Sequence, residues 1–537
     1  MCGIWAYVAR TSTKYPKDYR KGVDCLKARG PESTFVGEYS HGIWAFTRLA
    51  INGLNPDGMQ PFFLLDDSVS WMCNGEIYNA FLLERQYSMP RKSGSDCESI
   101  GHLYCIFDSY EAGVVPFVQK LDGEFAFILR DEDLQATVVA RDAYGVRPLF
   151  WGEDGEGGLY FGSERKSIQA FVKETLAFPP GEVWTITDGA IKKERYHAIP
   201  WIKLPLNVDP LPLIRSAFEE AVLKRVTTTE RPVAALLSGG LDSSLVCALA
   251  QRMLTNAGKM PLRTFSVGMK GSTDLAYAKK VADFIGSEHT EILVTADDMF
   301  SVIPQVIYDI ESYDITTVRA SVGNWLCGRY IRANTDCKVV LNGDGSDEVW
   351  GSYKYFRRAP SDDEFDLDCR RLLEEIHLYD VLRSDRSISC HGLEPRTPFL
   401  DKHFVALAMA VPTQQRRGDK LLLRSAFRSE NLLPEEVLWR EKEAFSDGVS
   451  SVEKSWFQEI QERVGIRTFL PTGKTPEPHT AEAYWYRQIF DSHFPNIGDP
   501  WPYWMPRWSP ETSDPSARTL AIEKNDHHAS YVSESTT

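Results

Sequence analysis

Apolar residues over positions 1 to about 197 occur in short runs, rich in aromatic and β-branched side chains and separated by turn residues. Runs of this kind predict β-strands. We expect strands in CGIWAYVA, GIWAFTRLAI, VSWMCNGEIYN, GEFAFILRD, ATVVARD and GLYFGSER. After Asp96 the apolar spacing changes to steps of three and four, which predicts a helix from CESIGHLYCIF onward. This part of the pattern therefore indicates sheets covered by helices.

The pattern changes after residues 198–212, AIPWIKLPLNVDPLP, whose four prolines are typical of a linker. LIRSAFEEAVLKRV (213–226) predicts a helix, and the runs VAALL, RTFSVGM, TEILV and KVVLNG then alternate with helical segments. Alternation of this kind predicts a doubly wound α/β domain, followed after about 360 by a mostly helical region. We therefore expect a first domain over 2–197, a linker over 198–212, a second domain over 213–518 and a polar, disordered tail over 519–537.

Length and composition agree with a soluble protein of at least two domains. The chain has 537 residues, 43% hydrophobic and 25% charged. A net charge of −15 argues against binding to nucleic acid or to anionic membranes, because both require a basic face. No apolar run reaches the roughly 18 residues that span a bilayer, and no signal peptide is visible. The ten cysteines lack zinc or CxxC spacing, which favours reduced thiols in the cytoplasm.

A cysteine at position 2, in MCGIWAYVAR, is the first candidate for chemistry. Removal of Met1 would leave Cys2 with both a thiol and a free α-amine, whose ordinary pKa of about 8 lets it act as a base. Nucleophile and base would then belong to one residue, as in N-terminal threonine nucleophiles. The alternative is a small buried residue that opens an edge strand. These ten residues leave both interpretations open.

The sharpest motif is SGGLDSS (238–244), which follows an apolar run and precedes a helical pattern. Its glycines and serines, with the N-terminus of the next helix, offer many donors to an anion. Asp242 fits such a loop if it holds a Mg²⁺ that bridges phosphates. The Walker A lysine is missing, and the loop matches that of the ATP pyrophosphatase family. The alternative is an ordinary glycine–serine turn that caps a helix.

A second acidic loop follows another β-rich run, in LNGDGSDEVWGSYKY (341–355). Asp344, Asp347 and Glu348 are suited to a metal ion or an ammonium group, although the spacing of a calcium loop is absent. A solvated acidic turn is the alternative. Beside the phosphate loop, the acidic loop is interpreted as the source of a second magnesium carboxylate.

Thirteen stretches together resemble the glutamine-hydrolysing asparagine synthetases, along the chain to about Arg518. They are MCGIWA, ARGPE, TRLAI, MQPF, NGEIYN, DGEFAF, RDAYGVRPLF, SGGLDSS, VADFIGSEH, YDITTVRAS, EAFSDG, YWMPRW and DPSAR. The late motifs favour the eukaryotic type. The resemblance implies a class II glutamine amidotransferase domain of the N-terminal nucleophile hydrolase fold, an αββα sandwich of the α+β class. It also implies a second domain of the ATP pyrophosphatase type with a helical C-terminal part.

For the first domain, the resemblance implies that Cys2 attacks the side-chain amide of glutamine and forms a thioester. Asn74 and Gly75 would be the oxyanion donors, and Arg48 would bind the glutamine carboxylate. Glu76 and Asp96 would accept the substrate's ammonium group. The other implied glutamine contacts are Leu49, Ala50, Ile51 and Asn52.

For the second domain, the resemblance implies binding of ATP with Mg²⁺ and of aspartate, formation of β-aspartyl-AMP, and its capture by ammonia that travels between the sites. The implied nucleotide and pyrophosphate contacts are Leu236, Ser238, Gly239, Gly240, Asp242, Ser243, Ser244, Val267, Asn342, Gly343 and Lys442. Asp242 and Asp347 would hold magnesium, and Arg319 is a further candidate for a carboxylate or phosphate contact. The family also implies a homodimer.

Three departures from the family pattern bear on efficiency. Asp344 stands where the family has a glutamate tied to adenylation and to the ammonia step, and its side chain is one methylene shorter. A placement error near 1 Å can lower a rate about a hundredfold. Pro395 and Thr397 replace aliphatic residues, and Glu441 adds negative charge before Lys442.

The alternatives are a synthetase acting on another acceptor, such as a β-lactam-forming relative, and an amidophosphoribosyltransferase. Relatives of the first kind lack the terminal cysteine that this chain has. An amidophosphoribosyltransferase would need a phosphoribosyl-pyrophosphate loop in place of SGGLDSS. A non-catalytic interaction protein would be expected to lose Cys2, Arg48, Asn74 or Asp242, all of which are present. A simple glutaminase is the reading if Asp344 disables the second site.

Overall fold

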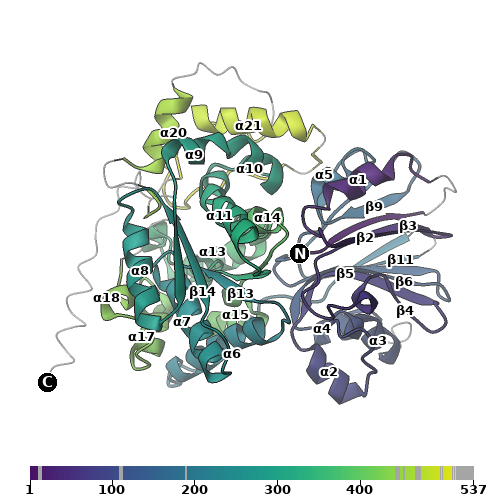
Figure 1. Cartoon of the computed structure of the whole chain (residues 1–537), viewed down its shortest axis with the longest axis horizontal. Coiled ribbons are helices and arrows are strands. Elements are labelled where there is room, and N and C mark those ends of the chain that lie inside the picture. The colour runs from purple at the N-terminus through teal and green to yellow at the C-terminus, as the bar shows by residue number, and fades with distance from the viewer. Residues whose placement is uncertain are drawn as a thin grey trace.

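The structure is a computed structural model that describes most of the chain. The described residues are 1–9, 15–107, 113–187, 190–441, 448–450, 454–465, 473, 475–495, 497–498, 500–510, 512 and 514–515. The predicted tail 519–537 and Lys442 lie outside them. Figure 1 shows a sheet-rich N-terminal part on the right and a larger helix-rich part on the left, with the N-terminus where they meet.

Two six-stranded antiparallel sheets form the N-terminal part. The first has the order β10-β8-β9-β1-β3-β2 and contains β1 (Gly3–Val8), β2 (Ser33–Tyr39), β3 (Gly42–Arg48), β8 (Phe150–Glu153), β9 (Leu159–Gly162) and β10 (Leu176–Ala177). The second has the order β12-β11-β7-β6-β5-β4 and contains β4 (Phe62–Leu64), β5 (Val69–Ile77), β6 (Gly123–Asp131), β7 (Ala136–Arg141), β11 (Glu182–Thr187) and β12 (Ala190–Arg195).

The two sheets pack face to face, and helices cover their outer faces. Ile4 of β1 and Trp44 of β3 share a buried cluster with Met72 of β5. The alternate residue Trp5 packs outward, next to α1 (Tyr19–Cys25) and α5 (Arg165–Ile168). Trp71 does the same beneath α2 (Ala80–Tyr87), α3 (Glu98–Ile106) and α4 (Val115–Lys120). Because both faces of these strands are buried, the strands are mainly apolar, and the αββα sandwich that the resemblance implied is confirmed.

The larger part is built on a five-stranded parallel sheet of order β15-β14-β13-β16-β17. Its strands are β13 (Val233–Leu236), β14 (Arg263–Gly268), β15 (Glu288–Leu293), β16 (Val339–Leu341) and β17 (Glu394–Arg396). Ala235 packs with α6 (Leu211–Thr227), α7 (Leu241–Asn256) and α8 (Thr273–Ile285). Ala234 faces the other side, with α10 (Ile303–Ile310), α11 (Ile315–Asn334) and α21 (Ala481–His493). Helices on both faces confirm the predicted doubly wound domain.

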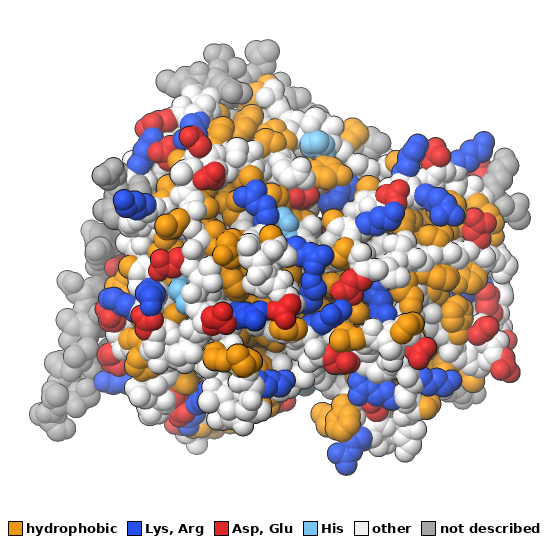
Figure 2. Space-filling view, viewed as in Figure 1, with side chains coloured by type: hydrophobic (Ala, Val, Ile, Leu, Met, Phe, Trp, Pro, Cys, Tyr) orange, Lys and Arg blue, Asp and Glu red, His pale blue; other side chains and the backbone are white. Residues whose placement is uncertain are grey.

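The remaining helices lie mostly in the C-terminal third, as the sequence predicts. They are α9 (Ala296–Ser301), α12 (Ser346–Trp350), α13 (Asp362–Glu375), α14 (Asp380–Ser389), α15 (Lys402–Ala410), α16 (Thr413–Arg416), α17 (Leu421–Arg428), α18 (Glu435–Leu438) and α20 (Trp456–Val464). The predicted domain limits stay predictions, although α6 begins at Leu211, inside the expected linker. In the part of the chain that is described, no helix is long and apolar enough to cross a membrane. On the face shown in Figure 2, acidic and basic side chains are interspersed.

The strand order places the two predicted loops side by side. β13 and β16 are neighbours in the middle of the sheet, and the chain leaves them toward opposite edges. Ligands of such sheets bind at the carboxyl ends of the strands, where the order reverses. The loops after β13 and β16 both begin at that position, and a Cβ on Gly343 would lie 2.9 Å from the backbone nitrogen of Ser243. The two loops are therefore in close contact.

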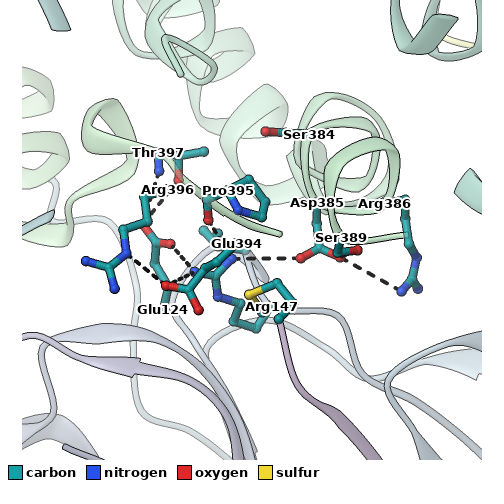
Figure 3. A network of polar contacts seen from close by, with 12 residues as sticks. Glu124, Arg147, Ser384, Asp385, Arg386, Ser389, Glu394, Pro395, Arg396 and Thr397 are labelled. Carbon is teal, nitrogen blue, oxygen red and sulfur yellow. Dashed lines mark hydrogen bonds and ion pairs between the residues drawn. The ribbon is translucent and has the colours of Figure 1, made fainter. Parts of the chain in front are cut away.

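Buried charged side chains join the N-terminal part to the larger part (Figure 3). Asp385 of α14 accepts hydrogen bonds from Arg29 at 2.8 and 3.2 Å and lies 3.8 Å from Arg147. Arg147 pairs with Glu124 at 3.0 Å and donates to the carbonyl of Pro395. These side chains are at most 3% exposed, so each charge depends on its partners for compensation.

We expect Asp385→Ala to lower the free energy of unfolding by about 3–5 kcal/mol, because it leaves buried arginines without a carboxylate. Urea unfolding followed by tryptophan fluorescence measures this change. Asp362→Ala is the control, since Asp362 pairs with Arg417 at the surface and such pairs contribute about 1 kcal/mol or less. Equal stability of the two variants would contradict the prediction.

Candidate active sites

Cys2 lies immediately before β1, and its thiol is partly buried against the loop that follows β3. The Cys2 Sγ donates to the carbonyl of Leu49 at 3.5 Å, and the carbonyl of Cys2 accepts from Arg29 at 3.1 Å. Burial raises the pKa of Cys2 to about 11. Burial also lowers the pKa of the Met1 amine to about 5. Burial would act in the same direction on the α-amine that removal of Met1 gives to Cys2, because desolvation disfavours an ammonium group.

The predicted oxyanion donor Asn74 lies on β5. Its side chain is fully buried, and neither the amide nitrogen nor the amide oxygen has a hydrogen-bond partner. A buried amide without partners is unfavourable, which indicates a group reserved for a ligand. The next residue must be glycine, because a Cβ on Gly75 would lie 2.1 Å from the carbonyl oxygen of Glu124. β5 and β1 face each other across the sandwich, so Asn74 and Cys2 come from opposing sheets.

Glu76 and Asp96 lie together, with Asn52 between them. The Asn52 amide donates to Glu76 at 2.7 Å and to Asp96 at 3.3 Å, and Asp96 also accepts from the backbone N–H of Ile77. Burial, and then repulsion from Asp96, raise the pKa of Glu76 well above its usual value, and burial raises the pKa of Asp96. Two buried carboxylates that repel each other favour a cationic ligand such as an ammonium group.

We expect kcat/KM for glutamine hydrolysis to fall as the pH decreases, because proton uptake by this carboxylate pair removes the charge that an ammonium group requires. Since both pKa values are raised, the loss begins above the ordinary carboxyl range of about 4. Asp96→Asn removes the repelling charge and should move the acid limb to lower pH while reducing kcat/KM at all pH values. An acid limb that stays in place in this variant would contradict the assignment.

Arg48 and the loop 49–53 complete the first site. Arg48 is buried and donates to the carbonyls of Asn55 and Gly53. Within the described residues it forms no ion pair, so its charge is available to a ligand carboxylate. Leu49, Ala50 and Ile51 are buried and present backbone groups toward Cys2, Glu32 and Glu230, respectively.

The second site is a cavity of about 300 Å³ at the carboxyl ends of β13, β14 and β16. Its lining includes most of the predicted nucleotide contacts, namely Leu236, Ser238, Gly240, Asp242, Ser243, Val267, Asn342 and Gly343. The predicted catalytic residue Asp344 and the predicted metal ligand Asp347 also line it. Gly239 and Ser244 belong to the same loop but do not line the cavity. Gly239 has φ +74° and packs against α8, where a Cβ would lie 2.5 Å from the backbone nitrogen of Ala278. Ser244 is fully buried, and its hydroxyl has no partner.

The loop hydroxyls are close enough to act on one anion. The Ser238 and Ser243 oxygens lie 3.0 Å apart, and Ser243 belongs to the first turn of α7, whose N-cap is Gly240. The N-terminus of a helix attracts negative charge through its free N–H groups and its dipole. The geometry therefore fits a phosphate-binding loop.

Asp242 and Asp347 converge on a single cation position. Lys420 Nζ lies 2.6 Å from a carboxylate oxygen of each aspartate and is 3% exposed. Magnesium is usually held by one or two carboxylates together with substrate phosphates. The pair therefore fits the magnesium ligands that the resemblance implied, although no group of three or more ligating side chains occurs among the described residues. Lys420 is absent from the sequence prediction, because it lies 178 residues after Asp242, directly before α17 and outside any motif that the sequence offers.

The predicted catalytic residue Asp344 is held by an arginine that the sequence did not single out. Arg383 donates to Asp344 at 2.9 Å and to Asp380 at 2.5 Å. Beside them Tyr353 donates to Glu348 at 2.5 Å, and burial together with repulsion from Asp380 raises the pKa of Glu348. The acidic loop is thus a partly buried network rather than a solvated turn.

Other predicted residues have different surroundings. Arg319 lines the cavity, but its guanidinium pairs with Glu482 at 2.5 Å and Asp514 at 2.8 Å, so its charge is already compensated. Thr397 contacts Glu124 at the interface between the two parts, and Pro395 accepts from Arg147 there. Glu441 lines the cavity as expected from its place in the sequence. Lys442, the predicted pyrophosphate contact, falls outside the described residues.

The chain matches two protein families. Residues 1–178 match "Glutamine amidotransferase domain", and residues 213–368 and 358–518 match "Asparagine synthase". "Asparagine synthetase [glutamine-hydrolyzing]" of Gallus gallus is 40% identical over 572 residues, with 98% of this chain and 99% of the relative covered. The protein of the same name from Homo sapiens is 40% identical over 576 residues, with the same coverage.

Among solved structures, glutamine phosphoribosylpyrophosphate amidotransferase from B. subtilis overlaps 55% of this chain and 91% of its own, with 15% identity and a TM-score of 0.33. That overlap is loose. The full-length sequence similarity is decisive, and it shows that the chain belongs to the family of glutamine-hydrolysing asparagine synthetases.

Proposed function

We propose that this chain is a ligase that makes L-asparagine from L-aspartate, with glutamine as nitrogen donor and with cleavage of ATP to AMP and pyrophosphate. Membership of the family supports the reaction. The observation that carries it is the presence, in one chain, of an unpartnered Asn74 amide on the sheet opposite Cys2 and of a separate cavity where Asp242 and Asp347 share a cation position.

At the first site, Cys2 would act as the nucleophile once Met1 is removed. The α-amine takes the thiol proton, and the sulfur attacks the side-chain carbonyl carbon of glutamine. The Asn74 amide and the Gly75 N–H stabilise the oxyanion, while Arg48 and the Glu76–Asp96 pair hold the two ends of the amino acid. The amine returns its proton to the leaving nitrogen, which departs as ammonia. Water then hydrolyses the thioester to glutamate and frees Cys2.

At the second site, the SGGLDSS loop would hold the phosphates, and Leu236 and Val267 would contact the nucleoside. Asp242 and Asp347 would hold Mg²⁺, which neutralises phosphate charge when bound. The side-chain carboxylate of aspartate attacks the α-phosphorus of ATP, pyrophosphate leaves, and β-aspartyl-AMP forms. Ammonia attacks the acyl carbon and AMP leaves with the bonding electrons. Asp344, whose carboxylate pairs with Arg383, would act at this second step.

Three further expectations remain part of the proposal. Lys442 would contact the departing pyrophosphate, and the chain would form a homodimer, as the family resemblance implies. A cytoplasmic location is supported by the ten cysteines, all of which are free thiols in the structure.

The decisive experiment supplies the full chain, with its N-terminus confirmed as Cys2, with aspartate, ATP and Mg²⁺, and with either glutamine or ammonium chloride. We expect asparagine from both nitrogen sources, with AMP and pyrophosphate in equal amounts. Glutamate without asparagine would replace the proposal with a simple glutaminase or with another acceptor. The shorter side chain of Asp344, at a position where the family has glutamate, is the observation that favours this second candidate. Failure to consume glutamine would remove Cys2 from the mechanism.

A further inference from the structure

The loop 49–53, which carries predicted glutamine contacts, is held in part by residues of the other part of the molecule. The segment 228–231, between α6 and β13, lies directly against it. The Glu230 carboxylate accepts a hydrogen bond from the Gly53 N–H at 2.7 Å, and the Glu230 N–H donates to the carbonyl of Ile51 at 3.1 Å. Arg231 donates to the carbonyl of Ala50 at 2.8 Å. Residues 50, 51 and 53 are thus each fixed by this segment.

The same loop sets the positions of three groups that the proposed glutamine hydrolysis requires. Its first carbonyl, on Leu49, accepts from the Cys2 thiol. Arg48 directly precedes it and donates to the Gly53 carbonyl at its far end. Asn52 bridges Glu76 and Asp96, and also donates to the carbonyl of Thr228 at 3.2 Å. A change in the shape of the loop would therefore move the carboxylate-binding arginine and the ammonium acceptors relative to the nucleophile.

On its other sides the loop 49–53 lies against backbone or a buried side chain. The segment 228–231 is therefore the support that a surface substitution can alter. Gly53 has φ +58°, and a Cβ there would lie 2.6 Å from the carbonyl oxygen of Ser93, so the loop already touches backbone on that side. On the other side, Arg396 joins the segment to the site. It lies 3.2 Å from Glu76 and donates to the carbonyl of Thr228 at 3.1 Å. One buried guanidinium thus fixes both the start of the segment and an ammonium acceptor.

The segment also leads directly into the synthetase sheet. β13 begins at Val233, two residues after Arg231, and runs through four residues toward the phosphate loop at Ser238. Four residues of strand span only about 13 Å. The support of the glutamine loop is therefore one end of a strand whose other end leads to the phosphate loop.

We propose that the segment 228–231 is a positioning element for glutamine hydrolysis, with Glu230 and Arg231 as positioning residues supplied by the synthetase part of the chain. Among the described residues, no hydrogen bond or ion pair joins either side chain to Cys2, to Arg48 or to the Glu76–Asp96 pair. Glu230 is exposed, and Arg231 pairs with Glu32 at the surface, so their individual contributions to folding are small. Their effect is on the shape of the loop. This inference rests on the proposed glutaminase activity of Cys2.

The test compares Glu230→Ala with Glu230→Gln in the full chain. The alanine variant loses the acceptor for the Gly53 N–H, and we expect KM for glutamine to rise about three- to tenfold, as loss of one partly exposed charged hydrogen bond implies. The glutamine variant keeps a side-chain oxygen and should return KM to within about twofold of the original value. Asparagine formation from ammonium chloride should stay unchanged in both, because Glu230 lies outside the nucleotide cavity.

A second measurement does not depend on turnover. Iodoacetamide alkylates an accessible Cys2 thiol, and bound glutamine should slow this reaction. The glutamine concentration that gives half protection should rise in Glu230→Ala by the same factor as KM. Glu220→Ala is the matched control, because Glu220 is an exposed carboxylate of the preceding helix that pairs only with Lys224 among the described residues.

Several outcomes would overturn the inference. An unchanged KM and unchanged half-protection in Glu230→Ala would do so directly. Equal effects in Glu230→Ala and Glu230→Gln, or equal losses with glutamine and with ammonium, would assign Glu230 to general stability. Loss of folding in Glu230→Ala would show the same, and a thermal scan detects it. If the unmodified chain neither hydrolyses glutamine nor shows protection, the proposed function fails instead, and the two failures are distinguishable.

Discussion

Replacement of Cys2 by alanine is expected to lower glutamine-dependent asparagine formation by about 10³-fold or more, because no other group can form the thioester. Asparagine formation from ammonium chloride should remain within about twofold. The predicted formation of β-aspartyl-AMP and its reaction with ammonia take place in the second cavity, which Cys2 does not line. Parallel assays of glutamate and asparagine with the two nitrogen sources measure both effects.

Cys25→Ala is the matched control for this variant. Cys25 is also a free, half-buried thiol in the N-terminal part, where it donates to the carbonyl of Lys21 within α1. It should retain full glutamine-dependent activity. Retention of glutamine hydrolysis in Cys2→Ala would refute the nucleophile, and loss of ammonium-dependent synthesis would indicate that Cys2 has a structural role at the junction of the two parts.

Asp242→Asn is expected to lower asparagine formation by about 10³-fold with either nitrogen source. It removes half of the carboxylate pair at the cation position and leaves Lys420 with Asp347 alone. Charge compensation at transferring phosphates commonly contributes several kcal/mol to the transition state. Pyrophosphate release should fall in parallel with asparagine, whereas glutamine hydrolysis at Cys2 should continue.

Asp283→Asn provides the comparison, since Asp283 forms an exposed pair with Lys279 on α8. A second readout is direct binding of Mn²⁺, followed by electron paramagnetic resonance in the presence of ATP. Asp242→Asn should weaken this binding and Asp283→Asn should not. Full synthetase activity in Asp242→Asn would exclude Asp242 as a metal ligand in the reaction.

Local sequence patterns determined most of the architecture. Six strands of the N-terminal sandwich, β1, β3, β5, β6, β7 and β9, were predictable because they are buried and their runs are mainly apolar. The other six strands of the two sheets were not predicted; β12, for example, is a mostly polar edge strand, AIKKER, without an apolar signal. The SGGLDSS loop was predictable for a similar reason, since strand, glycines and helix start lie within one continuous stretch.

The partners of the predicted residues were decided by tertiary structure alone. Lys420 meets Asp242 across 178 residues of sequence, and Glu230 meets Gly53 across 177. The local sequence pattern around a residue indicates whether its side chain is buried and in which element it lies. It does not indicate which distant charge the side chain faces. The sequence by itself thus determined many of the helices and strands, the two loops at the predicted phosphate site (238–244 and 341–355) and the candidate nucleophile Cys2. The compensation of their charges depended on the order of the strands, because that order alone brings separate loops to one edge of the sheet.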